Sequence, residues 1–312
     1  MESKEHNLND PKESIRTPEI PDSEWETLIL LQRHGRYDNR RPNDPEQLTE
    51  DEKEKLGRLT PEGKTEVIER TRERIGAILA RDPEHTDFLL MNSPTFWLDD
   101  ERLGQRARET AEIVAEEVTK QLKEKGLSET QLLNLAVREG TPAFKGGVSR
   151  PEKRLGEALM FQVPEFTQFL REEYGGQGVE FWKNFFRDTH KEKREEAGAE
   201  GPVEIADRMS EFLNVVARFS RMYHRKHPGR KLVPWIVAHG ESLEPYIQRV
   251  LGVPEEDFST GYGDGIGISV NADGHASTRI KDREYEIPFV THVSPKIPEV
   301  SAKNVPPAAT LP

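Results

Sequence analysis

Cysteine is absent from this sequence of 312 residues, which rules out disulfide bonds and thiolate metal sites and fits a reducing compartment. Long hydrophobic runs are also absent, since no segment approaches the roughly 20 apolar residues that a membrane-spanning helix needs. The opening residues, from Met1 to His6, lack the apolar core of a signal peptide. These absences predict a soluble, cytoplasmic protein that has no membrane partner.

Positive charge is comparatively scarce, because 45 Lys and Arg residues stand against 57 Asp and Glu residues, for a net charge of -12. An acidic chain of this kind is not expected to bind nucleic acid, and a basic pocket within it would instead select a small anion. The mean hydropathy is low, at -0.79, and 33% of the residues are charged. Apolar periodicity in several segments nevertheless predicts a folded protein.

What the sequence does contain is a short apolar segment, beginning at Thr27, that runs into the tripeptide Arg33-His34-Gly35. Its continuous Leu and Ile residues predict a buried strand, and Gly35 is expected to let the backbone turn sharply where that strand ends. A second apolar segment, starting at Val233, ends in His239-Gly240 in the same way. Open α/β sheets bind their ligands at the carboxyl ends of strands, so both histidines are predicted to lie in one site.

Strand and helix patterns alternate along the rest of the chain. Thr60 followed by Pro61 has the form of a helix start, with Thr as the cap and Pro at the first helical position. The alternation predicts a three-layer α/β/α sandwich with a mostly parallel central sheet and an inserted helical lid region. Further strands are predicted over residues 87–92, 133–137, 265–270 and 286–290, and further helices over 107–122, from 202 to the Pro228-Gly229 pair, and over 241–251.

The domain organisation is predicted from changes in composition. Residues 1–24 are polar and contain several prolines, which predicts a flexible lead-in. Residues 25–292 form the predicted α/β domain, and within it residues 141–200, which are rich in aromatic residues, are expected to be an inserted helical lid or substrate subdomain over the active-site end. The Pro-rich segment 293–312 is predicted to be a disordered tail.

Chemically distinctive side chains are predicted to meet at one edge of the sheet, namely Arg33, His34, Arg106 and His239. Guanidinium groups offer forked donors that match phosphate oxygens, and imidazoles supply either a nucleophile or further donors. The set fits a phosphoryl group, whereas its arginines would repel a metal cation. We therefore expect a small phosphorylated substrate as the partner, with neither a metal nor a cofactor.

The order and spacing of these residues resemble a known family. Arg33-His34-Gly35 after a first strand, Arg106-Ala107-x-x-Thr110-Ala111 on a later helix and the late His239-Gly240 resemble the histidine phosphatase (phosphoglycerate mutase-like) superfamily, over roughly residues 26–290. The resemblance implies an α/β sandwich and a phosphohistidine intermediate. It makes His34 the nucleophile, with Arg33, Arg106 and His239 binding the transferred phosphoryl group. Gly35, Gly240 and Asn39 complete the predicted substrate-binding set.

The leaving oxygen needs a proton, and the resemblance implies that a glutamate following the third strand supplies it. Glu139 matches that place and is the predicted general acid. Glu241, two residues after His239, is the alternative, because a related branch of the superfamily uses an aspartate directly after that histidine, where this chain has Gly240. Either carboxyl group needs a raised pKa to be protonated near neutral pH.

The sequence departs from the family pattern in two places. An extra stretch, Thr95–Gln105, separates Ser93-Pro94 from Arg106, which makes Arg102 an alternative phosphate ligand. After Gly35, the segment Arg36-Tyr37-Asp38-Asn39 differs from the Glu-Ser-x-x-Asn run of the mutases. The predicted function is therefore metal-independent hydrolysis of a small phosphorylated metabolite. The alternatives are a phosphoglycerate-type mutase and a non-catalytic protein that binds a phosphorylated ligand.

A separate pair of histidines, His224 and His227, has a spacing that metal ligands on a helix also show. The pair lies beside Arg225 and Lys226. Positive side chains are favourable at the carboxyl end of a helix, so a solvated helix end is the favoured interpretation. The sequence makes no prediction of the oligomeric state.

Overall fold

The computed structural model describes residue 20 and residues 24–38, 48–94, 105–134, 149–158, 163–255 and 260–289. The predicted tail of residues 293–312 lies outside these ranges, as does the predicted lead-in apart from residues 20 and 24. Asn39, Arg102 and Glu139 also fall outside them. Across the described ranges, no helix combines the length and the apolar character needed to cross a membrane.

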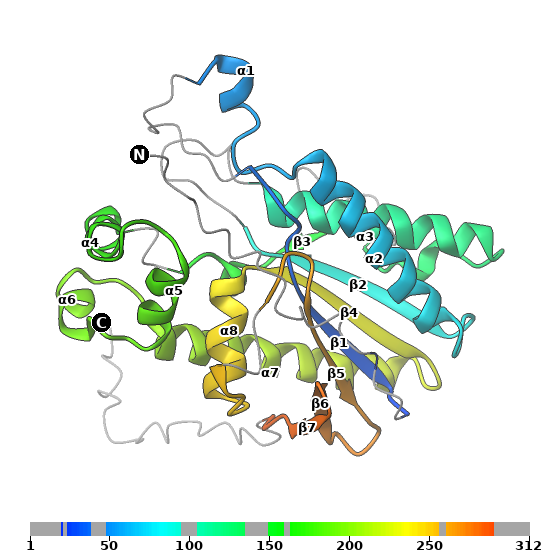
Figure 1. Ribbon diagram of the computed structural model, residues 1–312. Helices are drawn as coiled ribbons and strands as arrows, with labels where there is room; N and C mark the ends of the chain where they lie inside the picture. Colours follow the sequence, from blue (N-terminus) through cyan, green and yellow to red (C-terminus); the bar gives the residue numbers. More distant parts are fainter. Residues whose placement is uncertain are drawn as a thin grey trace, which may run out of the picture.

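A seven-stranded sheet, as far as the described residues define it, forms the centre of the fold (Figure 1). Its strand order is β3-β2-β4-β1-β5-β6-β7. Strand β4 pairs in parallel with β1 and β2, and β2 pairs in parallel with β3, whereas β5, β6 and β7 extend the sheet beyond β1 in antiparallel fashion. The strands are β1 (Thr27–Arg33), β2 (Thr86–Asn92), β3 (Arg150–Pro151), β4 (Lys231–Ala238), β5 (Gly265–Val270), β6 (Ala276–Ile280) and β7 (Arg283–Glu286).

The sheet is therefore mixed, and the predicted mostly parallel sheet is not confirmed. Antiparallel neighbours need only a tight turn between them, and Lys281, with φ 53°, provides one between β6 and β7. Strand β6 was not predicted from the sequence. An edge strand was expected over 286–290, whereas β7 ends at Glu286. Of the strand expected over 133–137, residues 133–134 form a turn and residues 135–137 lie outside the described ranges.

Helices cover both faces of the sheet and make the predicted three layers (Figure 1). Helices α2 (Pro61–Leu79) and α3 (Arg106–Glu124) lie against one face, and α7 (Pro202–Lys226) and α8 (Gly240–Arg249) against the other. The remaining helical elements are α1 (Glu50–Lys53), η1 (Glu129–Gln131), η2 (Lys153–Leu155), α4 (Pro164–Tyr174), α5 (Val179–Phe186) and α6 (Lys191–Glu196).

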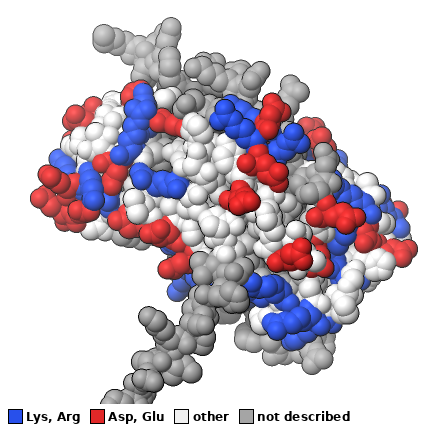
Figure 2. Space-filling view, turned by 90° about the horizontal axis from the view of Figure 1, so that it is seen from below, with Lys and Arg blue, Asp and Glu red and all other residues white. Residues whose placement is uncertain are grey.

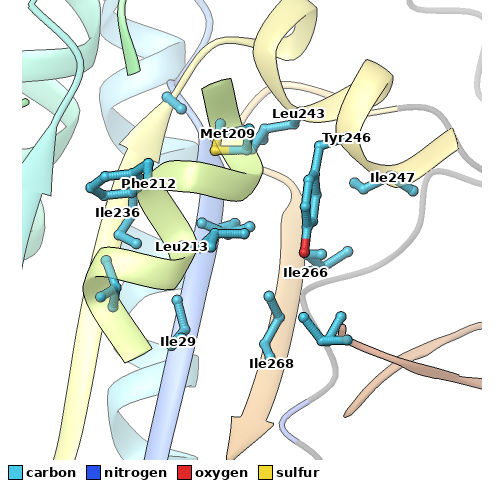
Figure 3. Close-up of a cluster of buried hydrophobic side chains, with 14 of the residues drawn as sticks. Ile29, Met209, Phe212, Leu213, Ile236, Leu243, Tyr246, Ile247, Ile266 and Ile268 are labelled. Atoms are coloured by element: carbon cyan, nitrogen blue, oxygen red, sulfur yellow. The ribbon is translucent and has the colours of Figure 1, made fainter. Parts of the chain in front are cut away.

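Almost every side chain of strand β1 is buried. Because alternate residues of a strand point to opposite sides, the strand is buried on both faces of the sheet. Leu28 and Leu30 pack in the layer of α2 and α3, while Ile29 packs in the layer of α7 and α8. Figure 3 shows Ile29 in that second core, together with Phe212 of α7 and Tyr246 of α8. Burying each such side chain stabilises the fold by about 1.5–3 kcal/mol, so the strand that ends at the predicted nucleophile is firmly anchored.

The helix boundaries follow the local sequence. Thr60 Oγ1 accepts a hydrogen bond from the backbone N–H of Gly63 at 3.0 Å, which confirms the predicted cap of α2. Gly126, which follows α3, has φ 70°, in the left-handed region that favours glycine after a helix. Helix α3 begins at Arg106, one residue before the predicted start at residue 107.

The predicted insertion of residues 141–200 contains α4, α5 and α6 in its described part, which confirms its helical character. Helices α4 and α5 share a separate buried cluster that includes Phe166, Phe181 and Phe185, and all three helices lie together beside the sheet (Figure 1). The same insertion also supplies the short strand β3. Its action as a lid stays a prediction.

Charges of both signs are mixed on the surface. Figure 2 shows one face of the molecule, on which acidic and basic side chains are interspersed. Exposed ion pairs elsewhere include Arg58 with Glu109 at 3.0 Å and Arg187 with Glu255 at 2.9 Å. The face in Figure 2 therefore offers no broad basic surface to a polyanion.

Candidate active site

The site lies at the carboxyl ends of three neighbouring parallel strands, β2, β4 and β1. Arg33 pairs with Ala238 in the sheet, so the next residues, His34 and His239, leave their strands side by side. The backbone N–H of His34 donates to the carbonyl of Ala238 at 3.0 Å, and the two imidazole rings lie 5.1 Å apart between centroids. Ser93 follows β2 and joins them from the other side of β4. The strand register thus brings the two His-Gly segments into one site.

His34 is held as a neutral imidazole with its Nε2 lone pair directed into the site. Its Nδ1 donates to the carbonyl of Gly35 at 2.8 Å, which leaves Nε2 to accept from Arg106 Nε at 2.9 Å. The side chain is only 2% exposed. Burial lowers the pKa of His34 well below 6.5, and the charges of Arg106, His239 and Arg33 lower it further. A neutral imidazole with this tautomer is the form that acts as a nucleophile through Nε2.

His239 is the second buried imidazole of the site and is also neutral. Burial lowers its pKa well below 6.5, and the neighbouring charges of Arg106 and Arg33 add to the effect. Its Nε2 lies 2.8 Å from Ser93 Oγ, and its Nδ1 lies 3.9 Å from a carboxylate oxygen of Glu241. Because His239 is also the residue before α8, it stands at the amino end of that helix, where anions are favoured.

Arg106, the first residue of α3, is the central cation of the site. Its Nε donates to His34 and its Nη2 to the carboxylate of Glu157. Burial alone would lower the pKa of Arg106, but the carboxylate of Glu157, with Tyr37 and Glu241, raises it above its ordinary value. The guanidinium is therefore a permanent positive charge beside His34. The alternative arginine, Arg102, lies outside the described residues.

Arg33 ends β1 and provides a second guanidinium. Its Nη1 donates to the carbonyl of Thr260 at 2.5 Å, and its Cζ lies 4.2 Å from the ring centre of Tyr262. Its Nε is buried and makes no hydrogen bond to any described residue. A Cβ atom at Gly240 would come within 3.2 Å of this guanidinium, so glycine at that position leaves it room. Arg33 thus keeps a donor available for a ligand.

Two tyrosines that the sequence analysis did not predict enclose His34. The ring of Tyr37 lies 5.1 Å from the imidazole and that of Tyr262 lies 5.9 Å from it. Tyr37 also stacks on Arg106, with Cζ 4.3 Å from the ring centre. Tyr37 stands in the segment that departs from the mutase pattern, which was a usable signal, whereas Tyr262 lies in a loop that carries no periodic pattern.

Two carboxylates form the remaining wall of the site, the buried Glu241 and the partly buried Glu157. Oxygen and nitrogen atoms of Glu157, His239 and Glu241 all lie within 4.8 Å of one another, a spacing that also suits a metal ion. Arg106, however, already neutralises Glu157 and would repel a divalent cation. Burial raises the pKa of Glu241 to about 7, and the nearby carboxylate of Glu157 contributes to the rise. Glu241 is therefore partly protonated near neutral pH.

Gly35 has a different role from the sharp turn that was expected. Gly35 is not one of the described glycines whose φ lies in the left-handed region. A Cβ atom there would come within 2.5 Å of Val67 Cγ2 on α2, so the close approach of the helix requires glycine. The backbone N–H of Gly35 donates to Thr110 Oγ1 of α3 at 3.0 Å. Gly35 thus fixes the loop after β1 between two helices.

The structure brings Arg33, His34, Arg106 and His239 together, and it places the alternative acid Glu241 beside them. The preferred acid, Glu139, and the substrate-binding candidate Asn39 lie outside the described residues. Sequence reasoning missed Glu157, because it stands in the aromatic-rich insertion and no recognised motif includes it.

The separate pair of histidines lies at the carboxyl end of α7, where the two rings have different neighbours. His224 Nε2 lies 2.7 Å from Thr27 Oγ1, at the start of β1, and burial lowers the pKa of His224. His227 stacks on the ring of Tyr223, with centroids 4.7 Å apart. His224 therefore lies at the end of β1 opposite to the end that His34 follows.

No protein-family model matches the chain, and no curated protein sequence matches it. Solved structures to which it is similar include a mycobacterial glucosyl-3-phosphoglycerate phosphatase, at 14% identity over 81% of this chain and 97% of that one, with a TM-score of 0.39. A phosphoglycerate mutase from Bacillus anthracis has 16% identity over 81% and 92%, with a TM-score of 0.41. Hafnia alvei phytase in complex with myo-inositol hexakis sulphate has 13% identity over 82% and 84%, with a TM-score of 0.36. The matched structures are histidine phosphatase or phosphoglycerate mutase-like proteins. Because these similarities are low, we base the functional assignment on the geometry of the site.

Proposed function

We propose that this protein is a phosphomonoester hydrolase of the histidine phosphatase type, with His34 as the nucleophile. The observation that supports this most strongly is the hydrogen bond of 2.9 Å from Arg106 Nε to the lone pair of His34 Nε2, beside a second neutral histidine. A metal ligand or a merely structural histidine has no need of a buried arginine at this nitrogen. The arrangement supplies a nucleophile and a positive charge at the same point.

In the proposed reaction, His34 Nε2 attacks the phosphorus atom of a phosphomonoester, so that an N–P bond forms as the P–O bond of the leaving alcohol breaks. The guanidinium groups of Arg33 and Arg106 balance the negative charge of the phosphoryl oxygens, and His239 contributes a further polar group. Water then attacks the phosphohistidine, the N–P bond breaks, and inorganic phosphate is released. The residues present account for each charge without a metal ion, so we propose that none is required.

The leaving oxygen takes a proton from a carboxyl group, and we propose Glu241 as its source. Glu241 is buried, faces His239 at 3.9 Å, and has a pKa of about 7, which suits a proton donor at neutral pH. The water that attacks the phosphohistidine returns a proton to the same carboxylate. Glu139, which the sequence analysis preferred, remains an alternative, but it lies outside the described residues, and the glutamate that directly follows the third described strand, β3, is Glu152.

The burial of His34 favours a phosphoglycerate-type mutase as a second candidate. At 2% exposure the nucleophile is shielded from water, and a mutase must protect its phosphohistidine until the phosphoryl group is returned. A hydrolase remains the first candidate because Arg36-Tyr37-Asp38-Asn39 differs from the corresponding run of the mutases.

Hydrolysis of an aryl phosphate by the wild type and by His34→Ala, with and without a chelator, tests the proposal. We expect release of phosphate that resists the chelator and is lost in the variant. Release that survives in His34→Ala would contradict the assignment of the nucleophile. Transfer between phosphoglycerate isomers with little release of phosphate would instead establish the mutase.

A further inference from the structure

Arg106 presents one edge of its guanidinium to two different groups. Its Nε donates to His34 Nε2 at 2.9 Å, and its Nη2 donates to the carboxylate of Glu157. These two N–H groups lie side by side on the planar guanidinium and form a fork that binds a carboxylate or a phosphate through two hydrogen bonds. A carboxylate of the chain itself therefore occupies part of the fork that the proposed reaction gives to the phosphoryl group.

A phosphoryl group cannot bond to His34 Nε2 while these contacts persist. A phosphorus atom bonded to His34 Nε2 cannot lie between that nitrogen and Arg106 Nε, since the two nitrogens are in hydrogen-bond contact at 2.9 Å. His34 and Arg106 are also almost completely buried, at 2% and 5% exposure. Formation of the N–P bond thus requires Arg106 to withdraw from His34 and so to exchange at least one of its partners.

We propose that Glu157 acts as an internal competitor of the phosphoryl group, whose carboxylate holds Arg106 until the phosphate of a substrate displaces it. This inference rests on the proposed function, because it assigns Arg106 to the phosphoryl group. Glu157 is then a specificity-determining residue. Only an anion that binds the guanidinium more strongly than a carboxylate does can open the site.

The chemical class of substrate follows from this exchange. A phosphomonoester dianion carries more charge than a carboxylate and has three oxygens that accept hydrogen bonds, so it can replace Glu157 on Arg106 and still face Arg33. A phosphodiester, with a single negative charge, gains less from the same exchange. Glu157 therefore selects terminal phosphate groups over phosphodiesters and carboxylates.

Binding of inorganic phosphate at neutral pH, measured by isothermal titration calorimetry, tests the inference. We expect Glu157→Gln to bind phosphate about tenfold more tightly than the wild type, because an internal ion pair that closes the site in roughly nine molecules of ten reduces the apparent affinity by that factor. The matched control is Glu117→Gln, which removes one carboxylate from an arginine pair elsewhere on α3. There Glu117 binds Arg72 at 2.7 Å, three turns from Arg106 along the helix, and phosphate affinity should be unchanged.

An equal or weaker affinity in Glu157→Gln would overturn the inference, since it would show that Glu157 only positions Arg106. Absence of phosphate binding by both proteins would overturn it as well. If Glu157→Gln fails to fold, as thermal unfolding would reveal, phosphate binding by Glu157→Asp tests the same inference. It keeps the charge but shortens the side chain by one methylene, so phosphate affinity should still rise.

The proposed function is tested separately, by measuring hydrolysis by the wild type and by His34→Ala. Tighter phosphate binding by Glu157→Gln in a protein that hydrolyses nothing would support the internal competitor while contradicting the hydrolase. Hydrolysis that depends on His34, together with unchanged phosphate affinity in Glu157→Gln, would support the hydrolase while contradicting the internal competitor.

Discussion

At the residue scale, burial sets the protonation states on which the proposed chemistry depends. It lowers the pKa values of His34 and His239, so both imidazoles are neutral, and it raises the pKa of Glu241 to about 7. A neutral nucleophile and a protonated acid are therefore available at the same pH. The permanent charges of Arg33 and Arg106 oppose any protonation of the histidines and leave the positive charge where the phosphoryl oxygens would lie.

Glu241→Gln should separate leaving groups that need a proton from those that do not. We expect kcat for an alkyl phosphate to fall about a hundredfold, which is at the low end for loss of a general acid, with little change for p-nitrophenyl phosphate. In the wild type, activity on the alkyl phosphate should decline as the pH rises above about 7, because Glu241 loses its proton there. Equal loss on both substrates would contradict the role, and the same effect in Glu139→Gln alone would make Glu139 the acid.

Tyr262 is expected to position Arg33 through its ring face, 4.2 Å from the guanidinium carbon. Tyr262→Phe keeps that face, whereas Tyr262→Leu removes it and should raise KM about fivefold to tenfold, as expected for loss of a cation–π contact of about 1 kcal/mol. Because Arg33 binds rather than reacts, kcat should change little. Steady-state kinetics with both variants would show the difference, and a matching rise in KM for Tyr262→Phe would assign the effect to the hydroxyl group instead.

Individual site residues differ in how far the sequence reveals them. The histidines and Arg106 stand at element ends that follow strong apolar patterns, so their placement was predictable. Glu157 was not, because it lies between η2 and α4, and only the three-dimensional packing of that insertion carries it to Arg106.

At the scale of elements, the close contact between the loop after β1 and helix α2 holds the proposed nucleophile, His34, in place. A Cβ at Gly35 would approach Val67 Cγ2 within 2.5 Å and Leu59 Cδ2 within 3.2 Å. Gly35→Ala should therefore destabilise the protein by about 1–3 kcal/mol, as overpacking commonly does, and should reduce activity because the loop shifts.

Chemical denaturation in urea would measure the loss of stability in Gly35→Ala. The double variant Gly35→Ala with Val67→Ala should recover part of it, since the smaller side chain makes room for the new methyl group. If Gly35→Ala proves as stable and as active as the wild type, the contact with α2 does not constrain the loop.

Elements with strong local signals were predicted well. Helix α2 starts after its Thr60 cap, and β5 has the predicted bounds of residues 265–270. The direction of strands β5 to β7 was not predicted, because short apolar segments do not encode whether a neighbour runs parallel or antiparallel. That choice depends on which strand edge is still open when the chain returns to the sheet, and this is set by tertiary packing.

At the scale of the whole molecule, the buried histidines link stability to pH. Each has a folded-state pKa below its ordinary value of 6.5, so the unfolded chain takes up protons first as the pH falls below 6.5, and stability is lost. Glu241 acts in the opposite direction. Its pKa rises from 4.5 to about 7, so the folded state retains a proton between these values and gains stability as the pH falls.

His239→Gln should therefore flatten the fall in stability between pH 6.5 and 5. One titrating group contributes up to about 1.4 kcal/mol per pH unit, and the variant lacks one of the three described histidines whose pKa is lowered, His34, His224 and His239. Urea unfolding at several pH values would measure the slope. An unchanged slope would mean that His239 is protonated in the folded protein.

The central claim is that His34 carries the phosphoryl group, and the most direct measurement is to trap that intermediate. The protein would be mixed with a phosphomonoester, quenched in alkali within milliseconds to seconds, and digested for mass spectrometry, because phosphohistidine survives base and is lost in acid. We predict a phosphate on the peptide that contains His34, attached to that residue and absent from His34→Ala. Turnover of the same substrate with no phosphate on His34, or with phosphate on another residue, would contradict the account.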